Sequence, residues 1–182
     1  MSRTHKMVLV SLFAALTAVG AFLKINLPPL PFTLQIFFVI FAGLLLGSKL
    51  GFASQAIYMA VGLVGVPIFA NGGGPQYVLQ PSFGFLLGFA AAAFVAGRIG
   101  ENSALIKNDI ARYLTASAAG VLACYAIGLP YLYIVVKYLN GKNVTAATII
   151  WKYFLLFLPW DLIKVAVASF LTVEIKKRIK LS

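Results

Sequence analysis

The chain has 182 residues, of which 62% are hydrophobic and only 10% are charged, with a formal net charge of +11. Soluble domains carry about 25% charged residues, so this composition excludes an ordinary water-soluble protein and indicates an integral membrane protein. The Lys and Arg residues stand in short clusters between apolar runs, which is the pattern of membrane topology signals rather than of a nucleic-acid site. We therefore expect one membrane domain over residues 1–182, in contact with lipid and with no nucleic-acid partner.

Six apolar runs of roughly 15 to 25 residues predict membrane-spanning helices, since a span needs about 20 residues. The expected ranges are 7–23, 33–47, 51–65, 83–98, 111–136 and 149–173. The second and third runs are short. The predicted fold class is thus an all-α integral membrane protein, a compact bundle of six transmembrane helices. Ten Lys and Arg residues fall on the side of both termini and four on the other, which predicts cytoplasmic termini.

Small residues recur at helical spacing along three of these runs. Ala14, Ala18 and Ala21 mark the first run. The longer stripes are Gly84, Gly88, Ala92, Ala96 and Gly100 in the fourth run and Ala116, Gly120, Cys124 and Gly128 in the fifth. Small side chains let helices approach closely in lipid. We expect the two longer stripes to pack within the bundle, whereas an external partner is a serious alternative for the first helix.

Two connections on the outer side are unlike solvated loops. Residues 25–35 contain Pro28, Pro29 and Pro31, which predict a stiff, extended segment. Residues 66–80 carry no charge and include three consecutive glycines. Non-helical backbone persists at membrane depth only where protein buries it or where it lines a cavity. We expect both segments to form a non-helical lid over the outer mouth of the bundle; the alternative is a pair of surface loops.

Asp161 lies at the centre of the last apolar run and is the only carboxylate deep in a predicted span. A charge at that depth costs about 2.5–3.5 kcal/mol on insertion scales and usually marks a functional site. Lys164 follows three residues later, on the same helix face. Two interpretations stay open: the pair binds a ligand, or it satisfies itself and only orders the core.

These features together predict a ligand cavity. The expected lid residues are Thr33, Gln35, Asn71, Gln76 and Tyr77, and the expected floor residues are Asp161, Lys164 and Trp160. Such donors, acceptors and flat apolar walls suit a small ligand with an apolar body, an amide-like group and an anionic end. Catalysis has little support because the single histidine, His5, precedes the first helix, and neither metal-ligand spacing nor a phosphate loop occurs. An intramembrane enzyme and a passive channel remain alternatives.

Three motifs together resemble the BioY family. They are PPLPFTLQ at 28–35, NGGGPQYVLQPSFGFLLGF at 71–89 and LPWDLIK at 158–164, and residues 12–21 resemble that family's first helix. The resemblance implies a six-helix, biotin-binding substrate subunit of an energy-coupling factor transporter, in the cell membrane of a prokaryote. It implies no enzymatic activity and no cofactor. A membrane coupling subunit and two cytoplasmic ATPase subunits would supply the energy, and a subunit for another vitamin remains the alternative.

The resemblance also implies residue roles. Asp161, Lys164 and Asn71 match ligand-binding positions, and Ala14 and Ala18 match the contact with the coupling subunit. Our hypothesis is that Asp161 accepts a hydrogen bond from the ureido ring of biotin, while Lys164 meets its carbonyl or carboxylate. Gln76 and aromatic side chains complete the site. Many relatives carry a glycine pair where this chain has Ser82 and Phe83.

Overall fold

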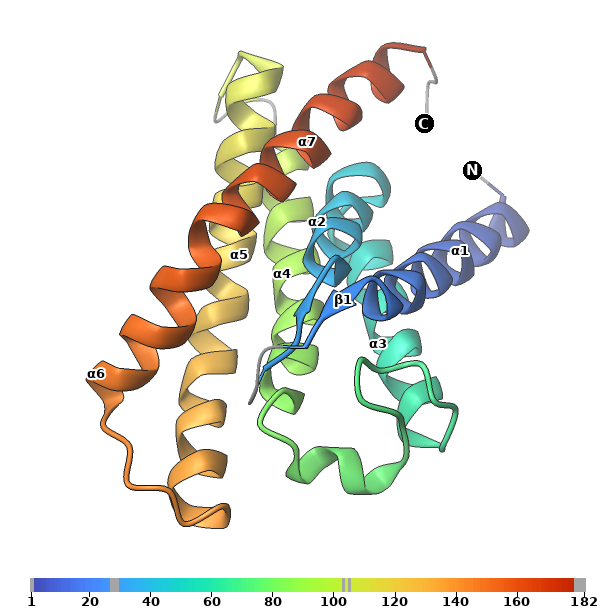
Figure 1. The fold of residues 1–182 in the computed structure, drawn as a ribbon. Coiled ribbons are helices and arrows are strands. Elements are labelled where there is room, and N and C mark those ends of the chain that lie inside the picture. The colour runs from blue at the N-terminus through green and yellow to red at the C-terminus, as the bar shows by residue number, and fades with distance from the viewer. Residues whose placement is uncertain (1, 27–29, 103, 105, 179–182) are drawn as a thin grey trace.

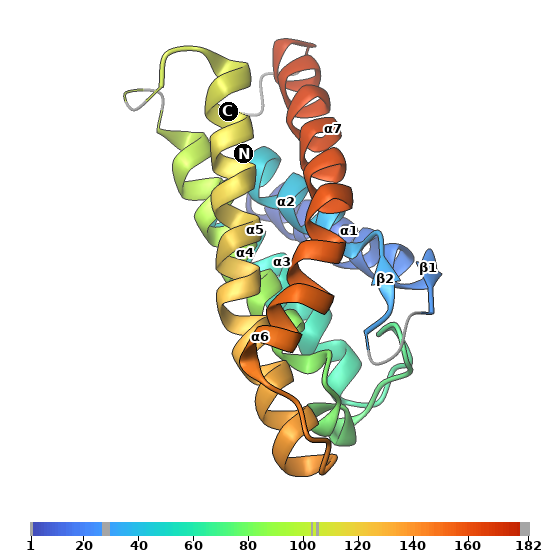
Figure 2. The ribbon, with the colours of Figure 1, turned by 60° about the vertical axis from the view of Figure 1, so that its left-hand side comes forward.

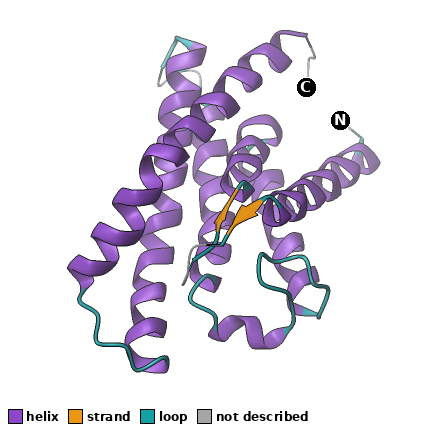
Figure 3. Ribbon diagram, in the orientation of Figure 1, coloured by secondary structure: helices purple, strands orange, loops and turns teal. Residues whose placement is uncertain are grey.

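The computed structural model describes residues 2–26, 30–102, 104 and 106–178. It confirms that every predicted run is helical, as Figures 1 and 3 show. The helices are α1 (Arg3–Phe22), α2 (Gln35–Leu46), α3 (Ser48–Leu63), α4 (Phe83–Glu101), α5 (Asp109–Ile134), α6 (Ala146–Ile149) and α7 (Leu156–Arg178). Two π-helical segments, η2 (Val135–Leu139) and η3 (Ile150–Leu155), extend α5 and join α6 to α7. The predicted all-α fold class is therefore confirmed.

Within the described part of the chain, four helical stretches are long and apolar enough to cross a membrane. They are α1, α4, α5 with η2, and α6 through α7. Helices α2 and α3 have 12 and 16 residues. At about 1.5 Å per residue they measure about 18 and 24 Å, against about 30 Å for the hydrocarbon core. The protein is thus a multi-pass membrane protein in which two helices are shorter than a full span.

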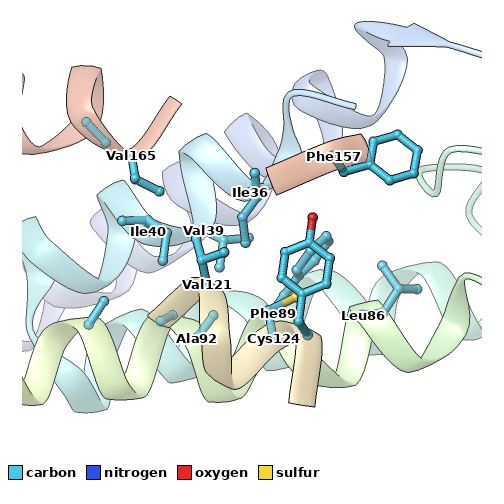
Figure 4. Packing of buried hydrophobic residues seen from close by; sticks show 14 of the residues in the cluster. Ile36, Val39, Ile40, Leu86, Phe89, Ala92, Val121, Cys124, Phe157 and Val165 are labelled. Atoms are coloured by element: carbon cyan, nitrogen blue, oxygen red, sulfur yellow. The ribbon is translucent and has the colours of Figure 1, made fainter. Parts of the chain in front are cut away.

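Helix α2 is enclosed by the rest of the bundle. Its side chains Val39, Ile40 and Leu44 are at most 1% exposed, because α1, α3, α4, α5 and α7 all pack against this helix. Figure 4 shows Val39 and Ile40 lying together with Val121 of α5 and Ala92 of α4. A helix that is apolar on all sides needs such a surround.

The two long stripes of small residues pack within the bundle, as predicted: all their members are buried, and the stripes meet where α4 contacts α5. A Cβ at Gly88 would lie 2.7 Å from the carbonyl oxygen of Cys124, so only glycine permits this approach. On α1, Ala14 is 9% exposed and belongs to the core, while Ala18 is half-buried. The role of these two residues at a partner interface stays a prediction.

Prolines mark the two places where the helical hydrogen-bond pattern changes. Helix α5 runs through Pro130 into η2, and η3 ends four residues before Pro159. Proline has no N–H group, so the carbonyl four residues earlier loses its usual partner. A π turn shifts pairing to the residue five positions on, and such turns often occur at functional sites.

The start of α1 and the end of α7 lie toward the same end of the molecule (Figures 1 and 2). The connections 64–82 and 140–145 lie at the opposite end. Both ends of the described chain therefore lie toward one end of the molecule, in agreement with the prediction that the termini share one side of the membrane.

Candidate functional site

A β hairpin follows α1 and reaches the middle of the molecule. Strand β1 (Lys24–Ile25) pairs antiparallel with β2 (Phe32–Thr33), and Lys24 lies opposite Thr33. The prediction of an extended, non-helical segment is confirmed for these residues. Pro28 and Pro29, on which the predicted stiffness rests, lie outside the described residues.

The second connection, 66–80, folds back on itself and contains a short helix that the sequence did not predict. Phe69 pairs with Gly72 in an isolated bridge, and the 3₁₀ helix η1 (Pro75–Leu79) follows. Pro75 occupies the first helical turn, where its missing N–H costs no hydrogen bond. The helix turns Tyr77 inward, to 3% exposure. Burial raises the pKa of the Tyr77 phenol, and its hydroxyl lies 3.1 Å from the Ser82 hydroxyl.

A cavity of about 90 Å³ lies between these two connections and helices α2, α4, α5 and α7. Six aromatic side chains form much of its wall: Phe32, Tyr77, Phe85, Phe89, Tyr125 and Phe157. Besides the two tyrosines, its polar side chains are Thr33, Gln35, Ser82, Cys124, Asp161 and Lys164. Helical spacing explains part of this grouping, because Phe157, Asp161 and Lys164 share one face of α7.

Asp161 is held by two charge-assisted hydrogen bonds. One carboxylate oxygen accepts from the Tyr125 hydroxyl at 2.6 Å, and the other accepts from Lys164 Nζ at 2.8 Å. The Asp161 and Lys164 side chains are only 9% and 10% exposed. A buried charge is tolerated when it is paired in this way.

Lys164 also ties α7 to the hairpin. Its Nζ donates to the Thr33 carbonyl oxygen at 2.8 Å and lies 3.9 Å from the centre of the Phe32 ring. The Phe32 ring in turn stacks on Phe157 at 5.7 Å. The Lys164 ammonium group therefore connects α7, which forms one wall of the cavity, to the β hairpin that covers it.

Neutral hydrogen bonds connect the hairpin to the second connection. Thr33 donates to Gln35 at 3.0 Å, Gln35 donates to the Tyr58 hydroxyl at 2.9 Å, and Tyr58 donates to the Ile68 carbonyl oxygen at 2.9 Å. Lys24 adds a second link, because its Nζ donates to the Ala70 carbonyl oxygen. The two segments thus form one connected cover, as the predicted lid requires.

Five of the predicted site residues line the cavity: Thr33, Gln35, Tyr77, Asp161 and Lys164. The structure does not bring the other three to it. Asn71 is exposed and lies 3.5 Å from Lys24 Nζ, and Gln76 is exposed and donates to the Gly73 carbonyl oxygen at 2.8 Å.

Trp160 is 57% exposed, and its ring packs against that of Phe32 in a T-shaped arrangement, with 6.2 Å between the ring centres. It precedes Asp161 by one residue, which turns its side chain about 100° away around a helix of 3.6 residues per turn.

Sequence reasoning missed Tyr125 and the phenylalanines of the wall. Phe157 carried a usable signal, since it precedes Asp161 by one helical turn. Tyr125 carried none, because only the fold brings it next to a carboxylate 36 residues away. As to metals, the described ranges contain no group of three His, Cys, Asp or Glu residues able to hold an ion.

Comparison with known proteins extends over nearly the whole chain. Residues 1–181 match the model of the BioY family. A probable biotin transporter BioY of Lysinibacillus sphaericus is 49% identical over 142 residues, 77% of this chain and 71% of that protein. The biotin transporter BioY of Thermotoga maritima is 37% identical over 174 residues, 95% of this chain and 96% of that protein.

The fold is similar to a crystal structure of the S-component for biotin from an ECF-type ABC transporter. The TM-score is 0.83 at 23% identity, over 97% of this chain and 95% of that one. At this sequence identity the structural similarity supports only the fold. The family model and the two relatives establish the family to which the chain belongs. This chain belongs to the BioY family.

Proposed function

We propose that this chain is the biotin-binding membrane subunit of an energy-coupling factor transporter and serves biotin uptake. The observation that carries the proposal is the buried Asp161–Lys164 pair on the wall of an aromatic-lined, covered cavity. The BioY relatives described as biotin transporters support the choice of ligand.

Biotin matches the hydrogen-bonding capacity that the pair leaves unused. A carboxylate offers about four acceptor sites and an ammonium group three donors. Asp161 uses two acceptor sites, for Tyr125 and Lys164, and Lys164 uses two donors, for Asp161 and Thr33. The remaining Asp161 sites accept a ureido N–H, and the remaining Lys164 donor meets the ureido carbonyl or the valerate carboxylate. The aromatic wall takes the apolar bicycle.

The cavity has to widen when biotin enters. Its volume of about 90 Å³ is below the roughly 300–1,000 Å³ that is usual for small-molecule sites. The hairpin is the segment that moves in this proposal, since one hydrogen bond, from Lys164 to the Thr33 carbonyl oxygen, and the ring contacts of Phe32 join it to α7. Asn71 and Gln76 are exposed, so their predicted contact with biotin requires an inward shift of the 66–80 connection.

The energy for uptake comes from partners in this proposal. The chain has no phosphate-loop motif; two cytoplasmic ATPase subunits hydrolyse ATP, and a membrane coupling subunit connects them to this chain. The coupling subunit packs against the half-buried Ala18 of α1 and the small residues near it, including the more buried Ala14 one helical turn earlier. Both termini face the cytoplasm of a prokaryotic cell, which the excess of Lys and Arg on their side supports.

Calorimetric titration of the purified chain with biotin, thiamine and riboflavin tests the proposal. We expect biotin alone to bind, and mass spectrometry of the bound molecule to return it unaltered. Binding of another vitamin in place of biotin would redirect the proposal to that ligand. A converted product would identify an enzyme instead.

A further inference from the structure

A second cavity, of about 520 Å³, lies between α5 and the segment formed by α6 and η3. We call it the α5–α6 groove. Its lining is almost wholly apolar and includes Leu122, Tyr125, Leu129 and Tyr133 of α5, with Ile150 and Phe154 opposite. The α5 residues follow one another at intervals of three and four and therefore form one helix face. Both walls belong to stretches that are long and apolar enough to cross a membrane, and the lining residues Leu122 and Ile150 are 56% and 48% exposed, as lipid-facing side chains are.

Three lysines, Lys137, Lys142 and Lys152, lie in or near the loop 140–145, which follows the Tyr133 end of the groove. Lys137 follows Tyr133 by four residues, and its Nζ donates to the Tyr133 hydroxyl at 2.6 Å. The same Nζ lies 5.0 and 5.3 Å from the ring centres of Tyr133 and Tyr138. Lys142 and Lys152 follow Lys137 in the sequence, and no acidic residue occurs between Asp109 and Asp161. This end of the groove therefore has cations without compensating carboxylates.

Exposed aromatic side chains accompany this charge. Tyr138 is 67% exposed and Trp151 is 73% exposed, close in sequence to Lys137 and Lys152. Tyr and Trp gather at the level of lipid headgroups, where their rings meet hydrocarbon and their polar atoms meet water. The cationic end of the groove thus has the composition of a headgroup-level belt.

We propose that the α5–α6 groove binds one acyl chain of an anionic phospholipid, whose phosphate lies beside Lys137. The apolar walls match the hydrocarbon chain, and the uncompensated cations match the phosphate. A transmembrane helix from another protein is a poorer fit, because such helices dock on faces of small residues. The long stripes of small residues in this chain are buried between α4 and α5.

The proposed lipid touches the wall of the ligand cavity. Tyr125 lines both cavities, its hydroxyl donates to Asp161 at 2.6 Å, and its ring packs edge-on against Phe154 at 5.1 Å. An acyl chain in the groove therefore lies behind the residue that orients Asp161. The lipid site itself does not depend on the identity of the ligand in the first cavity.

Photolabelling in vesicles tests the proposal. The chain is reconstituted in mixed phosphatidylglycerol and phosphatidylcholine, with a trace of either lipid carrying a photoactivatable group in its acyl chain, and the labelled peptides are mapped. We expect the phosphatidylglycerol probe to label 122–133 and 146–154 more strongly than the exposed face of α1. We also expect it to label these peptides more strongly than the phosphatidylcholine probe does.

Paired variants separate the groove from ordinary lipid contact. Ala126→Phe fills the groove and abolishes the excess labelling, whereas Ile127→Phe, one residue around the helix and outside the lining, leaves it unchanged. Lys137→Gln leaves the groove open but removes the preference for phosphatidylglycerol; Lys49→Gln retains it. The Lys137→Gln variant does not require the groove to be filled. It therefore still tests the proposal if the Ala126→Phe variant does not fold.

Equal labelling of the two phenylalanine variants would overturn the proposal. So would equal labelling by the two lipids in the unaltered chain. Cross-links between two copies of the chain through 122–133 would assign this face to a protein partner instead.

Discussion

Replacing Asp161 by Asn and Lys164 by Met, singly and together, separates what this pair does for folding from what it does for binding. The two side chains are 9% and 10% exposed and 2.8 Å apart. Removing one partner leaves an uncompensated buried charge, which costs about 3–5 kcal/mol, whereas replacing both is often neutral or stabilising. We therefore expect each single variant to unfold more readily than the unaltered chain and the double variant to recover.

In the double variant, biotin affinity should remain low although the stability of the fold recovers. An unpaired polar partner costs about 1–3 kcal/mol, which corresponds to a loss of about 5- to 150-fold in affinity at about 1.4 kcal/mol per decade. The double variant loses both contacts, so we expect at least about 25-fold weaker binding from a stable protein.

Two measurements decide the outcome. Cys124 is the only cysteine and is 3% exposed, so a thiol-reactive dye reports unfolding on heating, and calorimetry reports biotin binding. The matched control is Glu174→Gln with Arg178→Gln, an ion pair whose side chains are 53% and 77% exposed. Such surface pairs contribute about 0–1 kcal/mol, and neither member of this one lines the cavity. A stable double variant that binds biotin as tightly as the unaltered chain would refute the ligand role and leave the pair a structural one.

Tyr125→Phe removes a hydrogen bond to a charged group, so the free energy of unfolding should fall by about 1.5–3 kcal/mol, and biotin affinity measured by calorimetry should fall because Asp161 loses the group that orients it; unchanged affinity would leave Tyr125 with a structural role only. Ala18→Leu adds bulk at the proposed coupling surface and should lower biotin uptake by cells while the isolated subunit still binds; normal uptake would place the partner elsewhere. Gly88→Ala forces a Cβ to 2.7 Å from a Cys124 backbone atom and should destabilise the protein by about 1–3 kcal/mol. Leu87→Ala, on the more exposed neighbouring position, should shift the unfolding temperature less, and equal shifts would contradict the close contact of α4 and α5.

The membrane fold follows from local patterns and was therefore predictable. Each apolar run became a helix, and the stripe from Gly84 to Gly100 marked the face that packs on α5. The short length of α2 was visible in the sequence, but its place at the centre of the bundle was not. That place depends on which helices surround it, and such contacts join residues far apart in the chain.

The candidate site was predictable only in part for the same reason. Asp161 and Lys164 stood out because a charge in an apolar run is rare, and they share a helix face. Tyr125, which completes the environment of Asp161, looked like any tyrosine in a span. Trp160 is next to Asp161 in sequence but lies outside the cavity lining, because neighbours along a helix point in different directions.

Lys24 and Lys164 fasten the cover of the cavity to main-chain oxygens, those of Ala70 and Thr33. Every amino acid carries that oxygen, so a substitution at position 33 or 70 would leave both of these hydrogen-bond acceptors in place. Statistical searches for co-varying pairs would consequently overlook both links. Only a change of Lys24 or Lys164, or a change in the backbone path at Ala70 or Thr33, would remove these hydrogen bonds.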